Sequence, residues 1–396
     1  MAKTHLTKFH ATHHLLKTKN YKLKTNMIPF VDPKLHYKRL RKQILNKIDD
    51  TLGRGDLILR SQLAQFEKHI AKLVGTKYAI GVNSGYDALH MAVQAAGLGP
   101  NDEVITVAHT FVASISAIAN HGATPILIDV GQDYNMNMDL LEATITPKTK
   151  AIMPVHLNGR ICDMDRLMDI AKKHNLVVIE DAAQALGAKF KNKMAGSFGL
   201  AGCFSFYPFK MLGACGDAGI VTTNDPEVAR KITLLRYNGE DRVARKFVYH
   251  GYTALLDNVQ AAILDLKLKY FTKWISRRRE IAKIYQKGLA NVGDLQLPHW
   301  PDKRYFDVYQ NYVIRTKRRD VLVKYLGKNG VEIIISWPEP IYQHQVLQPN
   351  NYRLSETEAI CREVVSLPMN TEISQNQVRN IIKYIREFFS KSRGTE

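Results

Sequence analysis

Strand-like and helical segments alternate along much of the chain, and this alternation is the feature that most constrains the fold. Apolar, β-branched runs typical of strands lie at Tyr78–Val82, Glu103–Val107, Thr124–Val130, Lys150–Val155 and Leu176–Glu180. Helical spacing lies between them, as at Ala113–Asn120 and Met164–Lys173. The pattern predicts an α/β fold with a largely parallel sheet covered on both faces. Because ligands bind such sheets outside the carboxyl ends of the strands, the residues there indicate the function.

The length and composition allow a large core and more than one domain. The chain has 396 residues, of which 45% are hydrophobic. We expect a basic, disordered extension over residues 1–26, a large domain over 27–255 with an N-terminal helical segment, and a smaller C-terminal domain over 256–396 that includes a long connecting helix. The other expected elements are helices at Leu35–Leu52, Ser61–Val74, Asp257–Leu289 and Asn376–Phe389, and strands at Tyr312–Arg315 and Val331–Ile335.

The formal net charge of +19 favours an anionic ligand. Part of it comes from the extension, which holds Lys3, Lys8, Lys17, Lys19, Lys22 and Lys24 and no acidic residue. Without residues 1–26 the balance is 50 basic against 37 acidic residues, or +13. Charge alone is also typical of nucleic-acid binding, so it does not decide between a small anion and a polymer.

The cysteines and the hydropathy indicate a protein of a reducing compartment. Cys162, Cys203, Cys215 and Cys361 are widely spaced and form no CxxC pair, which argues against a zinc site or a disulfide framework. No apolar run approaches the length of about 18 residues expected of a membrane span. We therefore expect a cytoplasmic enzyme without a metal.

A small-residue turn follows the first strand and opens a helix. The segment Val82–Leu89 contains Ser84 and Gly85 at this turn. Free amides and the positive end of the helix dipole suit a phosphate group there, to which Ser84 adds a hydroxyl. Glycine and serine are also common at such turns for steric reasons, so this turn alone does not decide the ligand.

Two later strand ends carry an aromatic ring and a carboxylate. Phe111 follows the second strand and can stack on a flat ring or pack in the core. Asp181 follows the strand that ends at Glu180. A carboxylate at this place can hold the proton of a ring nitrogen, and it can also cap the next helix.

Lys210 follows an aromatic, strand-like run that begins at Gly202. Burial disfavours the ammonium form of a lysine and leaves an amine that attacks carbonyl carbons. Ser205 on the same run is a second candidate for binding phosphate. A phosphate turn, a stacking ring, an acid at a strand end and a lysine after a strand are together the parts that a pyridoxal phosphate enzyme needs.

The chain resembles the DegT/StrS family of sugar aminotransferases over about Ile28 to Ile385. The motifs that carry the resemblance are Asn83–Leu89, Thr110–Ala113, Ile152–Gly159, Glu180–Gln184, Phe204–Lys210, Gly216–Gly219 and Val365–Met369. The resemblance implies the aspartate aminotransferase type of fold (fold type I) and pyridoxal 5'-phosphate as the cofactor. It also implies a homodimer with the active site at the subunit interface.

Site roles follow from the resemblance, position by position. It makes Lys210 the Schiff-base lysine and proton carrier, and Asp181 the partner of the pyridinium nitrogen. Gln184 stands near the phenolic oxygen of the cofactor, and Phe111 is the stacking ring. The phosphate contacts fall on Ser84, Gly85, Tyr86 and Ser205, with Tyr86 contributing its backbone amide because many members have threonine there.

The same resemblance implies the reaction and its substrates. The amino donor is glutamate, and the acceptor is a keto-sugar linked to a nucleoside diphosphate, with the 3-keto position favoured over the 4-keto position by the form of the phosphate turn. The substrate contacts fall on His156, Trp337 and Tyr342. The product belongs to amino-sugar biosynthesis, as in the pathways of lipopolysaccharides and other polysaccharides.

This sequence departs from the family pattern at two places, and two other functions are therefore alternatives. Thr253 and Leu255 stand where members often have the asparagine and arginine of an Asn-Ser-Arg motif, and Trp337 and Tyr342 stand where relatives tend to have tyrosine and histidine. One alternative is a sugar dehydratase, although such members have histidine in place of Lys210. The other is a non-catalytic, polyanion-binding or regulatory relative.

Overall fold

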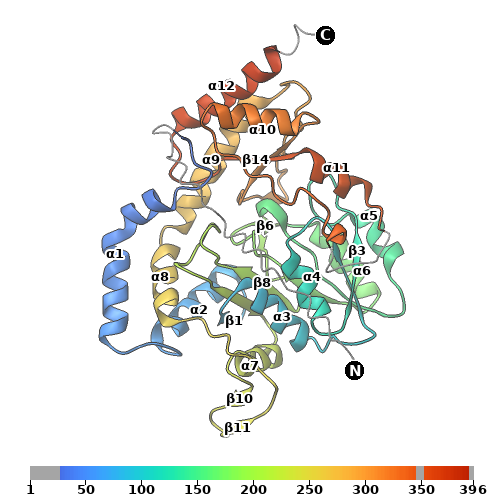
Figure 1. The fold of residues 1–396 in the computed structure, drawn as a ribbon. Helices are drawn as coiled ribbons and strands as arrows, with labels where there is room; N and C mark the ends of the chain where they lie inside the picture. The colour runs from blue at the N-terminus through green and yellow to red at the C-terminus, as the bar shows by residue number, and fades with distance from the viewer. Residues whose placement is uncertain (1–26, 345–351, 392–396) are drawn as a thin grey trace, which may run out of the picture.

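The computed structural model describes residues 27–344 and 352–391, so the extension expected over residues 1–26 lies outside it. Figure 1 shows a large α/β unit with a smaller unit above it. Up to Leu268 the elements are α1 (Pro33–Gly53), α2 (Ser61–Val74), β1 (Tyr78–Val82), α3 (Gly85–Ala95), β2 (Glu103–Val107), α4 (Val112–Ala119), β3 (Thr124–Ile128), α5 (Met138–Leu141), η1 (Glu142–Thr144), β4 (Thr149–Ile152), η2 (Leu157–Gly159), α6 (Met164–Lys173), β5 (Val177–Asp181), β6 (Lys189–Phe190), β7 (Lys193–Met194), β8 (Ala201–Ser205), β9 (Gly219–Thr223), α7 (Pro226–Leu235), β10 (Glu240–Asp241), β11 (Lys246–Phe247) and α8 (Asn258–Leu268). They are followed by α9 (Phe271–Leu289), β12 (Tyr305–Phe306), β13 (Tyr312–Arg315), α10 (Arg319–Lys328), η3 (Ile341–Gln343), α11 (Ser355–Glu363), β14 (Val364–Leu367) and α12 (Gln375–Lys391).

The main sheet is mostly parallel, as the alternation predicts. Within the described residues it has seven strands in the order β1-β9-β8-β5-β4-β2-β3. The pairs β2–β3, β2–β4, β4–β5 and β5–β8 are parallel. Only β9 runs the other way, antiparallel to both β1 and β8, and it adds to the strands expected from the sequence. The prediction of an α/β fold is confirmed.

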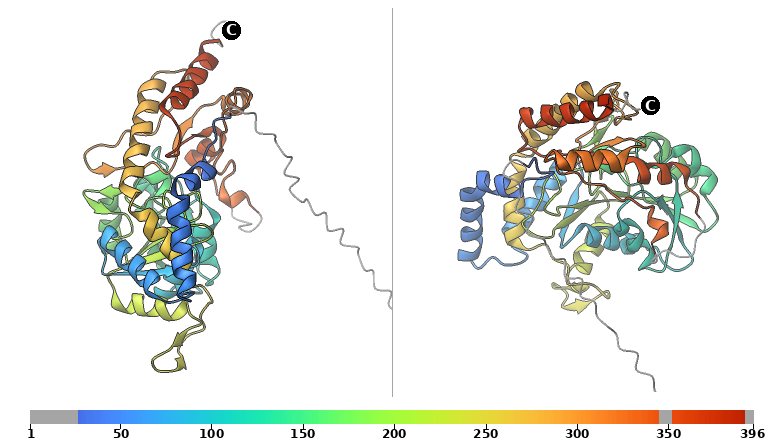
Figure 2. Two further views of the ribbon diagram at one scale, coloured as in Figure 1. Left: turned by 90° about the vertical axis from the view of Figure 1, so that its left-hand side faces the viewer. Right: turned by 45° about the horizontal axis from the view of Figure 1, so that its top comes forward.

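Helices bury apolar side chains against both faces of this sheet. On one face α3, α4 and α7 contribute residues such as Leu89, Ile118 and Ile232 to a common core. On the other face α2, α6 and α8 contribute Phe66, Leu167 and Leu264 to the largest core cluster. The views in Figure 2 show α1, in blue, beside the gold helix α8, which it covers from the outside.

The smaller unit has its own core between α9, α10, α12 and the antiparallel pair β13–β14. The long helical pattern from Asp257 is interrupted after Lys269, because α8 packs with the large unit whereas α9 continues into the smaller core. The strand expected at Val331–Ile335 is wrong, since this segment forms only isolated bridges to Ile28 and Ser366. Of the helices described between residues 27 and 391, none is long and apolar enough to cross a membrane.

The topology brings one end of most strands to a common edge. β2, β4, β5 and β8 share a direction, and β1 shares it too because both β1 and β8 run antiparallel to β9. The segments that follow these strands begin at Asn83, Ala108, Met153, Ala182 and Phe206. This edge is where the sequence places the predicted site.

Candidate active site

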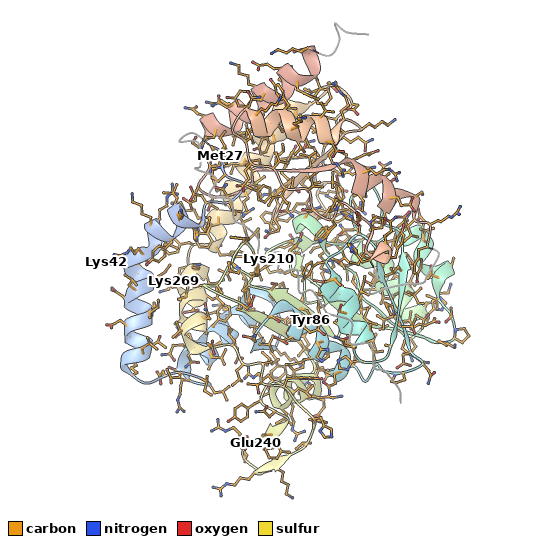
Figure 3. All side chains as sticks on the ribbon, viewed as in Figure 1. Met27, Lys42, Tyr86, Lys210, Glu240 and Lys269 are labelled. Atoms are coloured by element: carbon orange, nitrogen blue, oxygen red, sulfur yellow. The ribbon has the colours of Figure 1, made fainter. Side chains whose placement is uncertain are left out.

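A cavity of about 540 Å³ lies at this carboxyl edge and gathers most of the predicted site residues. Its lining includes Ser84, Gly85, Tyr86, Phe111, Asp181, Gln184, Ser205, Lys210 and Trp337. These residues end or follow β1, β2, β5 and β8, apart from Trp337, which follows α10, so the fold assembles them from distant parts of the sequence. In Figure 3, Lys210 lies at the centre of the molecule with Tyr86 below it.

The turn after β1 is shaped for a group that approaches its backbone closely. Ser84 caps α3, since its Oγ accepts a hydrogen bond of 3.0 Å from the amide of Asp87. A Cβ at Gly85 would lie 2.6 Å from the Cβ of Ser205, so only glycine fits between the turn and β8. The first turn of α3 directs amides that the helix cannot pair toward this end of the cavity.

Acidic side chains lie beside this turn. The Ser84 hydroxyl donates to Oδ2 of Asp87 at 2.7 Å. Burial raises the pKa of Asp87 and the nearby charge of Asp217 raises it further, while the hydrogen bonds from Ser84 lower it. Because the hydrogen of the Ser84 hydroxyl is donated to Asp87, the backbone amides are the main donors that this turn offers.

Lys210 lies in a tight turn that is fixed on both sides by Gln310. The Gln310 side chain donates to the carbonyl of Phe209 at 3.0 Å and accepts from the amide of Met211 at 2.9 Å. This clamp could not be predicted from local patterns, because Gln310 precedes β13 and is distant from Lys210 in the chain. Burial lowers the pKa of Lys210, and the charge of Asp181 opposes this shift. The result is a buried amine that is easier to deprotonate than an ordinary lysine.

Asp181 ends β5 with its carboxylate held at both oxygens. Oδ2 accepts a hydrogen bond of 2.7 Å from the hydroxyl of Ser114 on α4. Oδ1 accepts one of 3.1 Å from the amide of Ala183. Asp181 is only 5% exposed, and Ser114 is fully buried. Ser114 was not predicted from the sequence as a site residue, although a serine among the mostly apolar residues of this helix is unusual.

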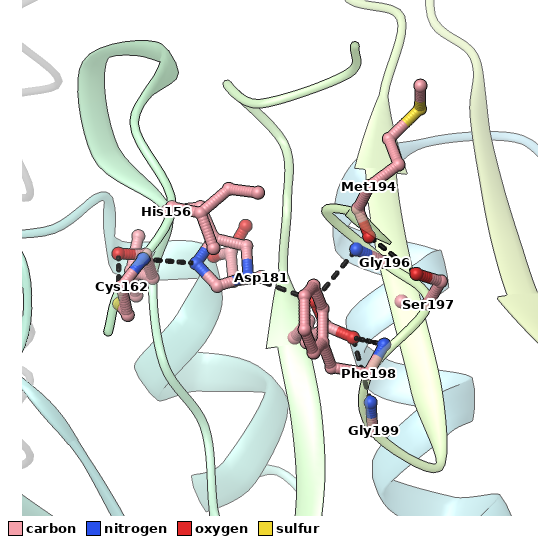
Figure 4. A network of polar contacts seen from close by, with 12 residues as sticks. His156, Cys162, Asp181, Met194, Gly196, Ser197, Phe198 and Gly199 are labelled. Atoms are coloured by element: carbon pink, nitrogen blue, oxygen red, sulfur yellow. Dashed lines mark hydrogen bonds and ion pairs between the residues drawn. The ribbon is translucent and has the colours of Figure 1, made fainter. Parts of the chain in front are cut away.

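The preceding residue, Glu180, is a structural carboxylate. It is completely buried and accepts hydrogen bonds of 2.7 to 2.9 Å from the amides of Gly196, Phe198 and Gly199. His156 Nε2 donates to it at 3.0 Å. Figure 4 shows how these bonds join the loop before β8 to His156, which lies between β4 and η2. The loop is thereby fixed where it leads into β8, the strand that precedes Lys210.

His156 and Tyr342 do not line the cavity, and their contact with substrate stays a prediction. His156 is fully buried, and its other ring nitrogen, Nδ1, accepts from the amide of Cys162 at 3.2 Å. Tyr342 is 6% exposed and donates to Glu358 at 2.9 Å within a small apolar cluster. In both cases tertiary hydrogen bonds direct the side chain away from the cavity.

The remaining predicted residues provide the cavity with flat and polar surfaces. Phe111 is 59% exposed at the start of α4, so its ring is free to stack on a ligand. The Gln184 side chain accepts from the amide of Asn158 at 2.9 Å. Trp337 has a positive φ of 51° and lies edge-on to His109, with 5.3 Å between ring centroids. Tyr86 accepts a hydrogen bond of 2.5 Å from Asn120, so its hydroxyl points away from the turn.

The two positions of the altered Asn-Ser-Arg segment have partners within the chain. Thr253 is exposed and donates to the side chain of Asn238 at 2.9 Å. Leu255 forms a bridge to Val82 at the end of β1. The segment is therefore held against the large unit close to the turn at Ser84.

Comparison with known proteins identifies relatives over nearly the whole chain. The model of the DegT/DnrJ/EryC1/StrS aminotransferase family matches residues 38–386. A pleiotropic regulatory protein of Geobacillus stearothermophilus is 40% identical over 91% of this chain and 98% of its own length. The dTDP-3-amino-3,4,6-trideoxy-alpha-D-glucose transaminase of Streptomyces venezuelae is 37% identical over 92% and 97%.

Solved structures agree with this assignment. Streptomyces venezuelae DesV, in complex with a ketimine intermediate, has a TM-score of 0.89 and 36% identity, covering 92% of this chain and 99% of its own. NtdA of Bacillus subtilis, with bound cofactor PMP, has a TM-score of 0.85 and 29% identity, covering 94% and 87%. The fold is therefore that of the pyridoxal phosphate-dependent sugar aminotransferases, fold type I.

Replacing Glu180 with glutamine should destabilise the protein. In Glu180→Gln an amide group would face three backbone donors with only one acceptor oxygen, and buried donors would lose their partner. We expect the free energy of unfolding to fall by about 3 kcal/mol, measured by urea denaturation of the cofactor-free protein. Glu339→Gln is a matched control on the surface and should change it by less than about 0.5 kcal/mol. Equal unfolding midpoints for the two variants would contradict the structural role of Glu180.

Proposed function

The chain belongs to the DegT/DnrJ/EryC1/StrS aminotransferase family and is a pyridoxal phosphate-dependent aminotransferase, and we propose that it transfers an amino group from glutamate to a keto-sugar linked to a nucleoside diphosphate. The observation that carries the proposal is the convergence of Lys210, Asp181 and the Ser84 turn on one cavity. An amine, a carboxylate and a phosphate-sized turn are separately common. Together they match the chemistry of one cofactor.

The cavity fits that cofactor at each end. A turn that admits no side chain at Gly85 suits a phosphate group, which takes hydrogen bonds from the amides of α3 and from Ser205. Asp181 would hold the ring nitrogen, and Phe111 would stack on the ring. Gln184 follows β5, lines the same cavity and would offer its side-chain amide to the phenolic oxygen.

Pyridoxal phosphate, when bound, carries the amino group from donor to acceptor and draws electrons away from the reacting carbon. Lys210 would hold the cofactor through Nζ and would move a proton to and from the reacting carbon. Its burial favours the neutral amine that both tasks require. Asp181 would hold the proton of the ring nitrogen. The presence of Lys210 favours amino transfer over dehydration, because a dehydratase of this family would have histidine here.

The acceptor is proposed to carry its keto group at the third sugar carbon. The Ser-Gly-Tyr-Asp-Ala-Leu turn favours this position, and the Streptomyces venezuelae relative is named for a 3-amino sugar. Trp337 also lines the cavity and is the proposed contact for the sugar. The basic balance of the chain suits the diphosphate. The product would enter polysaccharide biosynthesis in the cytoplasm, where the four free cysteines are stable as thiols.

The cofactor lysine can be tested directly. Lys210→Ala removes the only lysine that lines the described cavity, so amino transfer should fall by at least about 100-fold. Formation of the amino sugar from glutamate and the keto-sugar is followed by mass spectrometry. Lys269→Ala is the control, because Lys269 is exposed at the end of α8 and lies outside the cavity lining (Figure 3). Wild-type turnover by Lys210→Ala would refute the mechanism.

The substrate can be identified with a panel of keto-sugars. The enzyme loaded with pyridoxamine phosphate is offered 3-keto and 4-keto sugars on different nucleoside diphosphates, and product masses are recorded. We expect amination of the 3-keto sugars, and glutamate should restore the loaded enzyme. Amination of 4-keto sugars alone would overturn the proposed position. Restoration only by another amino acid would overturn the proposed donor.

We also propose that the enzyme is a homodimer with its active site at the subunit interface. Phe111, Tyr207 and Phe209 are each about half exposed around Lys210, and a second subunit would cover such an aromatic surface. Sedimentation velocity at micromolar concentration should give a particle of twice the 45.0 kDa chain mass. A monomer under conditions that support turnover would contradict this arrangement.

A further inference from the structure

Three side chains form a hydrogen-bonded series that ends on Asp181. Thr110 Oγ1 lies 3.0 Å from Ser114 Oγ, and Ser114 Oγ lies 2.7 Å from Asp181 Oδ2. All three are buried, with exposed fractions of 2%, 0% and 5%. Thr110 and Asp181 line the cavity, whereas Ser114 lies behind them on α4. The hydrogen bonds between Thr110, Ser114 and Asp181 therefore lie within the wall of the cavity, away from its opening.

The direction of the hydrogen bonds follows from the chemistry of the groups. Ser114 has a single hydroxyl hydrogen, and its acceptors are the Asp181 carboxylate at 2.7 Å and the Phe111 carbonyl at 3.4 Å. An ionised carboxylate only accepts, and the shorter bond to a charged group is the stronger one. Ser114 thus donates to Asp181. The Ser114 oxygen is then left to accept the hydroxyl hydrogen of Thr110.

The hydroxyl of Ser114 is not required by its helix. Apart from the half-buried Ser116, the other residues of α4 are apolar, and the neighbours Ala113, Ile115 and Ala117 are buried in the core. A buried hydroxyl destabilises such a core unless it is hydrogen-bonded, and an alanine would fill the position without that requirement. The bond to Asp181 gives the hydroxyl a role in the site.

We propose that Ser114 is a positioning residue for Asp181, and that Thr110 in turn orients Ser114. With Oδ1 held by the Ala183 amide and Oδ2 held by Ser114, the plane of the carboxylate is fixed and its remaining lone pairs face the cavity. The hydroxyl also stabilises the ionised form of the carboxylate, so that a shared proton stays on the ring nitrogen. This inference rests on the proposed function, because it assumes that Asp181 is the partner of that nitrogen.

Other charged groups near Asp181 do not replace Ser114. Lys210 and Cys203 both interact with Asp181 through its charge, and Glu180 is its neighbour in β5. No hydrogen bond joins Asp181 to a side chain other than Ser114 among residues 27–344 and 352–391. Removing the Ser114 hydroxyl therefore removes the one side-chain hydrogen bond to Asp181 among the described residues.

The test compares Ser114→Ala with Ser116→Ala, the same change two residues along α4. We expect Ser114→Ala to lower kcat about tenfold with KM for the keto-sugar unchanged, since one hydrogen bond to a charged group is lost. The affinity of the cofactor-free protein for pyridoxal phosphate should fall by a similar factor. Ser114→Thr, which retains the hydroxyl, should restore both values, and Ser116→Ala should match the wild type.

A cofactor analogue separates positioning from a purely structural effect. In 1-deazapyridoxal phosphate a carbon replaces the ring nitrogen, so Asp181 has no ring proton to hold. Ser114→Ala should therefore bind this analogue as well as the wild type does. Equal losses of affinity for cofactor and analogue would overturn the proposal. If Ser114→Ala fails to fold, Thr110→Val supplies the test, with a smaller loss confined to the natural cofactor.

Asp181→Asn, measured in parallel, distinguishes the two levels of inference. A large loss of kcat in Asp181→Asn together with wild-type behaviour in Ser114→Ala would overturn the positioning role alone. Wild-type behaviour in Asp181→Asn would refute the role of Asp181 in the proposed function, and the positioning role with it. If Ser114→Ala and Asp181→Asn both lose affinity for pyridoxal phosphate but not for the analogue, the result supports the role of Asp181 and the positioning role of Ser114.

Discussion

The last two residues of β5 are the constraint on which the site depends. Successive side chains of a strand point to opposite faces of the sheet, so Glu180 and Asp181 serve two different surroundings. Glu180 is satisfied entirely by the loop before β8 and by His156. Asp181 points toward α4 and the cavity. Because the two carboxylates are adjacent in one strand, the hydrogen bonds that hold Glu180 also fix the position of Asp181 in the cavity wall. The same bonds hold the loop that leads into β8, after which Lys210 follows.

Close backbone contacts at glycine residues also determine the shape of the site. A Cβ at Gly219 would lie 2.1 Å from the carbonyl oxygen of Ser84, and a Cβ at Gly202 would lie 2.2 Å from the Cα of Gly196. Both contacts involve backbone atoms that cannot move without displacing a strand. The antiparallel strand β9 thus packs against the turn after β1 at Gly219, and Ser205, the partner of Gly219 in β8, also approaches this turn. The shape of the turn therefore depends on Gly85 and Gly219, where a side chain would clash with neighbouring atoms.

Sequence reasoning located the chemistry along the chain but not the direction of each side chain. The strands, the strand-end acid Asp181 and the lysine Lys210 follow from local patterns, because apolar periodicity and the position of a residue after a strand are local properties. His156 also follows a strand, yet it pairs with Glu180 away from the cavity. Tyr342 is drawn into an apolar cluster in the same way. Ser114 was not predicted as a site residue, because its hydrogen-bond partner Asp181 is distant in the sequence.

The charges that line the cavity explain why backbone amides must provide much of the binding of a phosphate group. Apart from Lys210, the described lining contains no lysine or arginine, while it includes the carboxylates of Asp181 and Asp217. A bound phosphate would add further negative charge, and burial already shifts Lys210 toward its neutral form. Free amides and the dipole of α3 must therefore supply much of the compensation within this chain. Such donors are fixed by the fold and cannot be deprotonated, so the phosphate end remains complementary to an anion while Lys210 is free to gain and lose its proton at the other end.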